Sequence, residues 1–103
     1  MFIIKNRVNG EYDTKGLYGS MDKLNRGCWA TLRHAKNHVS QKVRAYCREL
    51  QYIDWYIDAD YIEIDETGTL NVFPVIDHLK TYFTNNYKAK YLTNEQKIKL
   101  GLT

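Results

Sequence analysis

The fold of this chain is decided by residues 31–50, which read TLRHAKNHVSQKVRAYCREL. On a helical wheel with about 100° per residue, the apolar side chains of this stretch gather within one arc of about 120°. They are Leu32, Ala35, Val39, Val43, Tyr46, Cys47 and Leu50. Thr31 suits the N-cap position, because its hydroxyl can accept a backbone N–H of the first turn. The pattern predicts an amphipathic helix of about five turns that packs on a sheet.

A first β-hairpin is predicted before this helix. Residues 2–5 form its first strand, and Asn9-Gly10 forms the turn, because both residues tolerate a positive φ. Residues 11–15 alternate and are expected to return as the second strand. Residues 16–27, with three glycines, are expected to form an irregular loop.

A second hairpin is predicted after the helix. Residues 61–65 alternate with Ile62 and Ile64 facing inward, and residues 70–73 answer them as the antiparallel partner. Pro74 cannot donate to a ladder, so this strand ends there or lies at a sheet edge.

Two short helices are expected in the last third of the chain. Asp77 can cap a helix over residues 78–84, and Thr93 with Gln96 forms a capping box for a final helix. Residues 51–60 fit neither a helical nor a strand period.

The simplest packing of these elements is one α+β domain over residues 1–103. Two β-hairpins would form a four-stranded, mostly antiparallel sheet, with one long amphipathic helix across it. A polar extension rich in Tyr and Lys would begin at about residue 85. Trp29 is expected to be a buried anchor at the start of the helix. The expected core joins Leu32, Val39, Val43 and Leu50 to Ile3 or Ile4, Ile62, Ile64 and Val72.

Length and composition exclude several classes of protein. A chain of 103 residues that is 44% hydrophobic and 26% charged can bury one core and is too apolar for a disordered segment. No apolar run approaches the roughly 20 residues that cross a bilayer, and the N-terminus does not resemble a signal peptide. Two cysteines are too few for a disulfide scaffold. We therefore expect a cytoplasmic protein with no membrane contact.

Charge is segregated along the chain. Residues 1–48 carry a net charge of +7, residues 49–79 carry −8 with no Lys or Arg, and residues 80–103 carry +4. The blocks either neutralise one another within the fold or form a bipolar surface with one pole for a charged partner. Nine tyrosines add side chains that suit half-buried faces and interfaces.

The polar side of the long helix is the clearest candidate binding surface. Its centre consists of Arg33, Asn37, Ser40, Arg44 and Arg48, and Lys36 lies at its edge. Arginine and asparagine are donors that contact phosphates and base edges. The other two interpretations are a solvated face that balances the acidic block and a basic protein-binding surface.

The acidic block supplies a second candidate surface, formed by Asp54, Asp58, Asp60, Glu63, Asp65 and Glu66. Paired carboxylates can hold Mg²⁺ or transfer protons. Acids spread among aromatics without the spacing of a calcium loop are more often a solvated face. A further interpretation is a partner surface that imitates the phosphate charge of DNA.

The histidines and cysteines give no complete metal or nucleophile set. His34 and His38 share a helix face, but a zinc site needs three or four ligands, and no Glu lies between them. We interpret both as polar surface histidines. Cys47 lies on the apolar arc and is expected in the core, and Cys28 has no orienting partners for nucleophilic catalysis. We expect no metal, no cofactor and no catalytic residues.

Several short segments carry a resemblance to a known group of proteins. They are Phe2-Ile3-Ile4-Lys5-Asn6 with Gly10-Glu11-Tyr12, Trp29-Ala30-Thr31-Leu32 with Ala35-Lys36-Asn37-His38, and Tyr61-Ile62-Glu63-Ile64-Asp65. In these segments the chain resembles small accessory proteins of tailed phages and mobile elements. The resemblance implies a phage accessory protein in the host cytoplasm and supplies no catalytic residues.

The sequence therefore favours a non-enzymatic binding protein. We expect it to bind, and thereby modulate or inhibit, a host macromolecule, most simply a host protein, through a charge-segregated, Tyr-rich surface. The alternative is a small nucleic-acid-binding module, for example a DNA-binding one, that uses the basic face of the long helix.

Overall fold

A computed structural model describes residues 1–15, 26–46 and 50–102 of the chain. Within these residues the fold is α+β, with a three-stranded antiparallel sheet in the order β1-β2-β3 and four α-helices. The strands are β1 (Phe2–Asn6), β2 (Ala59–Asp65) and β3 (Gly68–Pro74). The helices are α1 (Leu32–Tyr46), α2 (Leu50–Ile57), α3 (Val75–Phe83) and α4 (Asn94–Lys99), with a 3-10 helix η1 (Tyr87–Tyr91) before α4.

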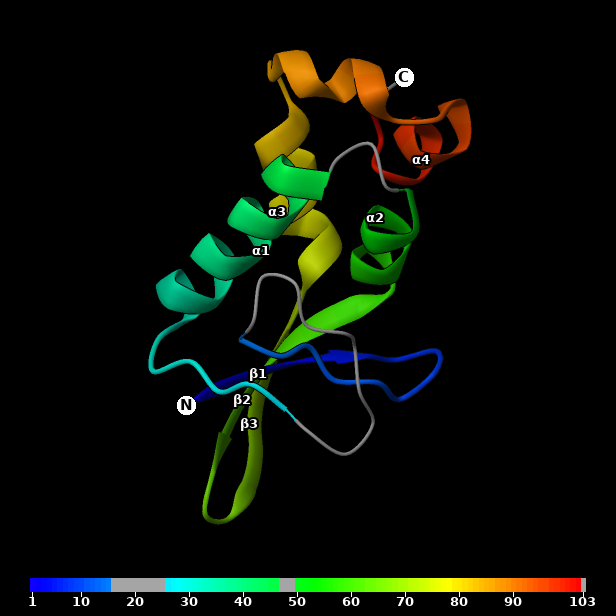
Figure 1. Cartoon of the computed structure of the whole chain (residues 1–103). Coiled ribbons are helices and arrows are strands. Elements are labelled where there is room, and N and C mark those ends of the chain that lie inside the picture. Colours follow the sequence, from blue (N-terminus) through cyan, green and yellow to red (C-terminus); the bar gives the residue numbers. More distant parts are fainter. Residues whose placement is uncertain (16–25, 47–49, 103) are drawn as a thin grey trace.

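The register of the sheet separates a helix-covered face from an outer face. Ile4 lies opposite Tyr61, and both are buried in the hydrophobic core. Ile3 lies opposite Ile62, which in turn lies opposite Val72. Because paired residues point to the same side of a sheet, this second set lies on the face away from the helices. In Figure 1, α1, α2 and α3 lie above the sheet, and the β2–β3 hairpin extends away from them.

The predicted fourth strand over residues 11–15 is wrong. This segment forms only an isolated bridge between Lys5 and Tyr12. Its backbone still follows β1, since the Asp13 N–H donates to the Ile4 carbonyl at 2.9 Å. The ladder stops here because Asp13 turns its carboxylate into the interior and its own carbonyl accepts from Gly27 at 2.8 Å. Trp29 then covers the next part of the same edge by a bridge to Phe2.

The predicted single helix over residues 32–50 is also wrong. α1 ends at Tyr46, and a separate helix, α2, begins at Leu50 and ends at Ile57. α2 occupies much of the stretch 51–60 that fits neither period in the sequence. Leu50 is 40% exposed, so the apolar arc of α1 does not continue to it. Cys47, predicted on that arc, lies outside the described residues.

The core confirms the helix-on-sheet arrangement. Val39 and Val43 of α1 are fully buried, together with Ile53 of α2 and Leu79 of α3. Trp29 is 7% exposed, which confirms it as an anchor before α1. Part of the predicted core is wrong, because Val72 is 52% exposed and Ile62, Ile64 and Leu32 are only half-buried.

The terminal elements confirm some local signals and correct one. Thr93 and Gln96 form the predicted capping box at the start of α4. Pro74 ends the edge strand β3, as expected, and serves as the N-cap of α3. α3 therefore begins at Val75, and Asp77 lies within its first turn and is not the cap. The turn after β1 includes Gly10 with φ of +76°, which agrees with the Asn-Gly signal.

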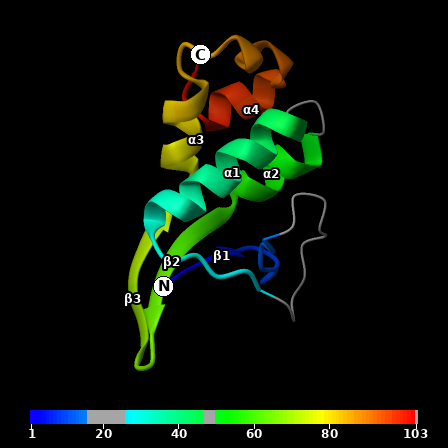
Figure 2. The ribbon, with the colours of Figure 1, turned by 60° about the vertical axis from the view of Figure 1, so that its left-hand side comes forward.

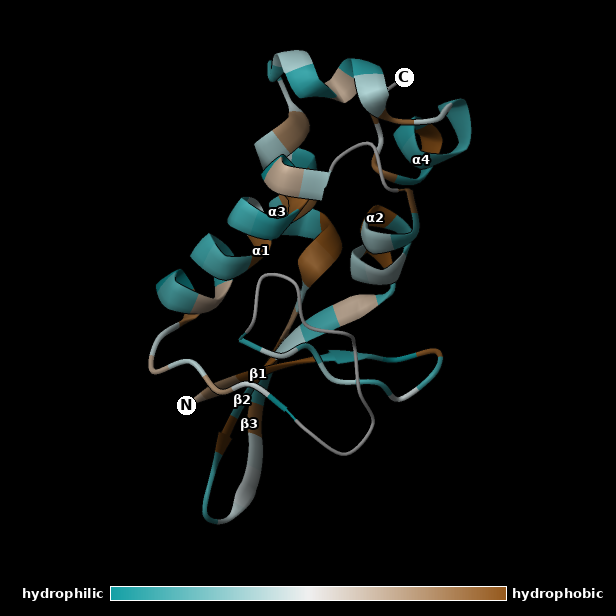
Figure 3. Cartoon of the chain, viewed as in Figure 1, coloured by the Kyte–Doolittle hydropathy of each residue, from teal (hydrophilic) through white to brown (hydrophobic). Residues whose placement is uncertain are grey.

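The molecule is elongated, measuring 41 × 24 × 23 Å. The β2–β3 hairpin lies at one end, and η1 with α4 lies at the other, as both Figure 1 and Figure 2 show. The ribbon of α1 is mainly hydrophilic along its length in Figure 3. No helix in the described ranges is long and apolar enough to cross a membrane.

Candidate functional site

The outward face of α1 carries the predicted basic stripe. Arg33, Asn37 and Arg44 are exposed, and Lys36 is half-buried at the margin. Arg48, the last residue predicted for the stripe, lies outside the described residues. Lys88 of η1 adds a cation at the end of α1, because its Nζ donates to the Arg44 carbonyl at 2.6 Å. Ser40, predicted at the centre of the stripe, is instead half-buried and hydrogen-bonded to His78 of α3. The exposed part of the described stripe therefore consists of Arg33, Asn37 and Arg44.

A hollow of about 420 Å³ lies beside this stripe. Trp29 and Ala30 form its apolar wall, and its polar lining consists of Lys15, His34, Asn37, His38 and Gln41. No Asp or Glu is among these lining residues. Its chemistry suits an anionic group better than a cation.

Behind the hollow lies a buried polar cluster centred on Asp13, which we call the Asp13 cluster (Asp13, His38, Lys42 and Tyr56). The Asp13 carboxylate is fully buried. It accepts hydrogen bonds from the Tyr56 hydroxyl at 2.5 Å, from His38 Nε2 at 3.1 Å and from Lys42 Nζ at 3.4 Å. The Thr14 backbone N–H donates to the same carboxylate at 2.9 Å. The cluster fixes residues 13–14, α1 and α2 relative to one another.

This cluster corrects the prediction that His38 is a surface residue. His38 is only 8% exposed, and its ring packs against that of Trp29 with 4.9 Å between ring centroids. A carboxylate can only accept, so Nε2 of His38 carries the hydrogen that Asp13 accepts. His34, one turn earlier, is exposed as predicted. His34 and His38 look alike in the sequence, because Asp13, the partner of His38, lies 25 residues away along the chain.

Within the cluster, the Tyr56 hydroxyl is held in its protonated form. Burial, followed by the charge of Asp13 and the hydrogen bond to it, raises the pKa of the Tyr56 hydroxyl well above its ordinary value. The phenol therefore stays protonated and donates. The hydrogen bond from Tyr56 to Asp13 is therefore part of what holds the fold together.

A second buried polar chain joins β2, α3 and α1. The Tyr61 hydroxyl is 2.5 Å from His78 Nδ1, and Ser40 Oγ is 3.0 Å from His78 Nε2. Burial lowers the pKa of His78 to about 4, with a smaller contribution from Lys36, and burial raises the pKa of Tyr61. A protonated Tyr61 phenol therefore shares one hydrogen bond with the neutral His78 imidazole, and Ser40 shares another with the second ring nitrogen.

The predicted acidic residues do not converge on one site. Asp54 is exposed on α2 and accepts from Gln96 Nε2 at 3.0 Å, and Asp58 is half-buried just after α2. Glu63 accepts from Asn71 at 2.7 Å across the hairpin. Asp65 accepts from the Thr67 hydroxyl and backbone N–H, and these bonds lower its pKa. In the described part of the chain no three His, Cys, Asp or Glu side chains are placed to hold a metal ion.

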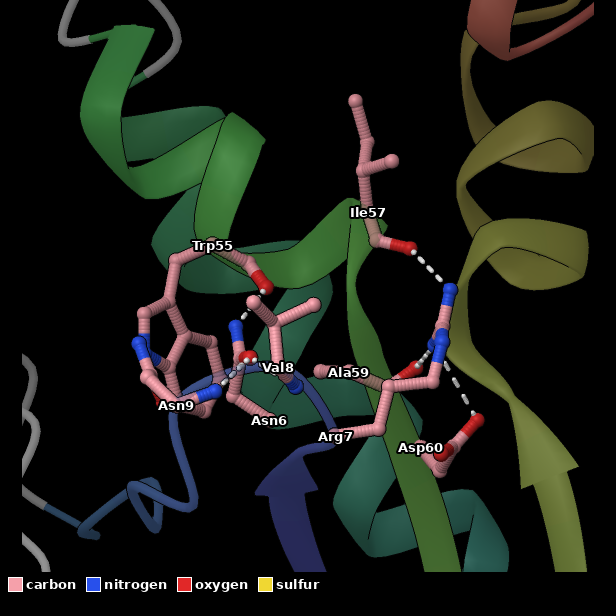
Figure 4. A network of polar contacts seen from close by, with 8 residues as sticks. All are labelled: Asn6, Arg7, Val8, Asn9, Trp55, Ile57, Ala59 and Asp60. Atoms are coloured by element: carbon pink, nitrogen blue, oxygen red, sulfur yellow. Dashed lines mark hydrogen bonds and ion pairs between the residues drawn. The ribbon is translucent and has the colours of Figure 1, made fainter.

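Asp60 is used within the fold. Figure 4 shows Arg7 reaching from the turn after β1 to the end of α2. Its guanidinium donates to the Ile57 carbonyl at 3.2 Å, to the Ala59 carbonyl at 3.3 Å and to Asp60 Oδ1 at 3.4 Å. A cation at the carboxyl end of a helix satisfies its last carbonyl groups. The Arg7–Asp60 pair joins the basic N-terminal block to the acidic block. The pairs of Asp13 with His38 and Lys42 lie within the N-terminal block itself.

The β2–β3 hairpin presents an apolar surface that sequence reasoning missed. Every residue of β3 is exposed, including Leu70 at 51%, Val72 at 52% and Phe73 at 39%. We call residues 62–73 of this hairpin the β2–β3 arm; residues 62–64 are half-buried and residues 65–73 are exposed. Its sequence signal was a strand without charge, GTLNVFP, beside a strand rich in acids.

Comparison with protein-family models, with curated proteins and with solved structures gives no match.

Proposed function

We propose that this chain is a non-enzymatic binding protein that engages a protein partner through the β2–β3 arm. The observation that carries the proposal is β3, an edge strand whose seven residues are all exposed although three of them are large and apolar. Leu70 and Val72 are more than half exposed, and Phe73 adds exposed apolar surface on the face of the strand opposite to Val72. Exposed apolar side chains gathered on one short strand favour an interaction site.

The open edge of β3 supplies the mode of binding. Within the described residues β3 pairs only with β2, so alternate N–H and C=O groups on its other side point outward. Natural sheets protect such edges with lysines, prolines or bulges. β3 contains no lysine, and its protection is limited to the terminal Pro74 and one register shift next to Glu63 and Ile64. An extended segment of a partner can add to this edge as a further strand.

The charge of the arm selects the chemistry of the partner. β3 carries no charge, whereas β2 and the turn carry Glu63, Asp65 and Glu66. A partner segment that alternates apolar and basic side chains fits both features. Following the resemblance to phage accessory proteins, we propose that this partner is a host protein.

The basic stripe of α1 supports a second candidate, in which the chain binds nucleic acid. The supporting observation is that Arg33, Asn37 and Arg44 are exposed next to a hollow whose lining contains no acid. Few cations are involved, so duplex DNA would be held by three or four phosphate contacts. Each contact contributes a slope of about −0.9 in log K against log salt.

Affinity capture from a bacterial lysate, with and without nuclease, separates the two candidates. The first predicts a discrete protein band that survives nuclease and is lost in a Leu70→Lys/Val72→Lys variant. The matched control is Ile98→Lys, since Ile98 is also apolar and 65% exposed but lies on α4 at the other end. A band that is lost on nuclease treatment, or in Arg33→Ala/Arg44→Ala and not in the arm variant, would favour nucleic acid instead.

A further inference from the structure

We propose a second binding site, for a small organic anion, in a hollow between the end of α3, η1 and the C-terminal segment. The hollow has a volume of about 380 Å³. Phe83, Ala89 and Leu102 give it an apolar floor, and Asn85, Lys90 and Lys97 are among its polar lining residues. This volume is within the range of small-molecule sites, which combine an apolar wall with a few polar groups.

The described residues that line the hollow carry positive charge on Lys90 and Lys97. No Asp or Glu is among its lining residues. Glu95 is the one acid in the segment 80–103, and it forms its ion pair with Lys99 at 3.5 Å, not with Lys90 or Lys97. In the described part of the chain neither of these two lysines has a carboxylate partner. An anion in the hollow would meet two ammonium groups that have no carboxylate partner among the described residues.

The position of Lys90 is supported by aromatic rings. Its Nζ lies 5.3 Å from the ring centroid of Tyr91 and 5.9 Å from that of Tyr87. Cation–π contacts of this kind restrict a flexible side chain while leaving its N–H groups available to an anion. Lys97 is half-buried on α4, directly after the capping-box residue Gln96, and its position is therefore set by a capped helix.

The apolar floor determines which anion fits. Phe83 is 1% exposed and closes the base of the hollow, while Leu102 and Ala89 are half-buried at its sides. A free inorganic anion would contact the lysines and leave the apolar floor exposed to water. A carboxylate or phosphate attached to a small apolar group would contact the lysines and also cover the apolar floor. The ligand class is therefore an amphipathic anion, with phenyl phosphate as a simple probe.

The test is a titration of the ¹⁵N-labelled chain followed by two-dimensional NMR. Phenyl phosphate should shift the amides of residues 83–90 and 97–102 saturably, with a dissociation constant in the millimolar range because the hollow is shallow. Inorganic phosphate and neutral benzyl alcohol should each bind at least about fivefold more weakly, because each lacks one of the two contributions.

Variants distinguish a defined site from general attraction to a basic surface. Lys90→Gln and Lys97→Gln should each weaken phenyl phosphate about fivefold, as expected for the loss of one charge near 4 Å in a wet site. Lys99→Gln is the matched control on the same helix, since Lys99 pairs with Glu95, and it should change binding less than about twofold. An equal loss in Lys99→Gln, equal binding of benzyl alcohol, or no saturable shift would each overturn the proposal. The hollow lies far from the β2–β3 arm, so the result does not depend on the proposed protein partner (Figures 1 and 2).

Discussion

Replacing Asp13 with asparagine should destabilise this fold more than any surface substitution. Asp13 is fully buried, and its carboxylate accepts from Tyr56, His38 and Lys42 as well as from a backbone N–H. Asparagine has the same size but keeps only one of the two acceptor oxygens. Its NH₂ group would take the place of the other oxygen and face hydrogen-bond donors. It also removes the negative charge that faces Lys42 at 3.4 Å.

The expected cost follows from these contacts. Removing one partner of a buried ion pair costs about 3–5 kcal/mol. A small domain has a total stability of about 5–15 kcal/mol, so Asp13→Asn should lose a large part of its free energy of unfolding. Tyr56→Phe removes one hydrogen bond to a charged acceptor and should cost about 1.5–3 kcal/mol. This milder variant keeps the prediction measurable even where Asp13→Asn does not fold.

Urea-induced unfolding at pH 7, followed by far-ultraviolet circular dichroism, gives the free energies directly. Asp77→Asn is the control, because Asp77 is an exposed carboxylate in the first turn of α3 and should cost at most about 1 kcal/mol. The reasoning is refuted if Asp13→Asn and Tyr56→Phe both lie within about 1 kcal/mol of the unmodified chain.

Three further predictions concern the core, a turn and one histidine. Val43→Ala should cost about 1–3 kcal/mol, because Val43 is fully buried between α1 and the sheet, and a loss below about 0.5 kcal/mol in urea unfolding would contradict this. Gly10→Ala should cost about 1 kcal/mol although nothing lies within 4 Å of the added carbon, because φ of +76° is unfavourable for alanine, and an unchanged melting temperature would contradict this. His78 has a pKa of about 4 in the fold, below its unfolded value of about 6.5, so the unfolded chain binds the proton first. Stability is therefore complete above about pH 6.5 and falls as the pH decreases through 4, by at most about 2 kcal/mol because solvent screens a partly buried ring. Urea midpoints between pH 7.5 and 4 should decrease less in His78→Gln, and an identical slope would contradict the assignment.

Helical periodicity and capping predicted much of the fold because both are local. The wheel placed Val39 and Val43 in the core, and the Thr93–Gln96 spacing placed the start of α4. The end of α1 at Tyr46 was not predicted, because the apolar pattern continues to Leu50 although the chain starts a new helix there. Periodicity alone does not show where two short helices replace a long one.

The absence of the fourth strand could not be predicted, because residues 11–15 alternate in the sequence as a strand would. Residues 11–15 leave the ladder to bring Asp13 to His38, Lys42 and Tyr56, which are 25 or more residues away in sequence. A buried ion cluster that joins distant segments leaves no periodic signal. The same reason explains why His38 looked like a surface residue in the sequence.

The inward face of the second hairpin was assigned to the wrong side for a different reason. Both sides of this hairpin are apolar: Ile62 and Val72 lie on one side, and Tyr61 and Phe73 on the other. Hydrophobicity favoured the aliphatic side. The structure buries Tyr61 instead, because its ring fills the core while its hydroxyl reaches His78.

The candidate binding surfaces were predictable in part. The exposed residues of the basic stripe follow directly from the wheel of α1. The acidic residues lie on α2 and along β2 in separate roles, which sequence order alone does not reveal.

The central claim is that the open edge of β3 binds an extended basic segment. The most direct measurement is an NMR titration of the ¹⁵N-labelled chain with two designed peptides of equal length, one alternating valine with lysine and the other valine with glutamate. The account predicts saturable shifts and slowed amide exchange in residues 68–74 with the lysine peptide, and neither with the glutamate peptide. Equal responses to both peptides, or shifts confined to α1, would contradict it.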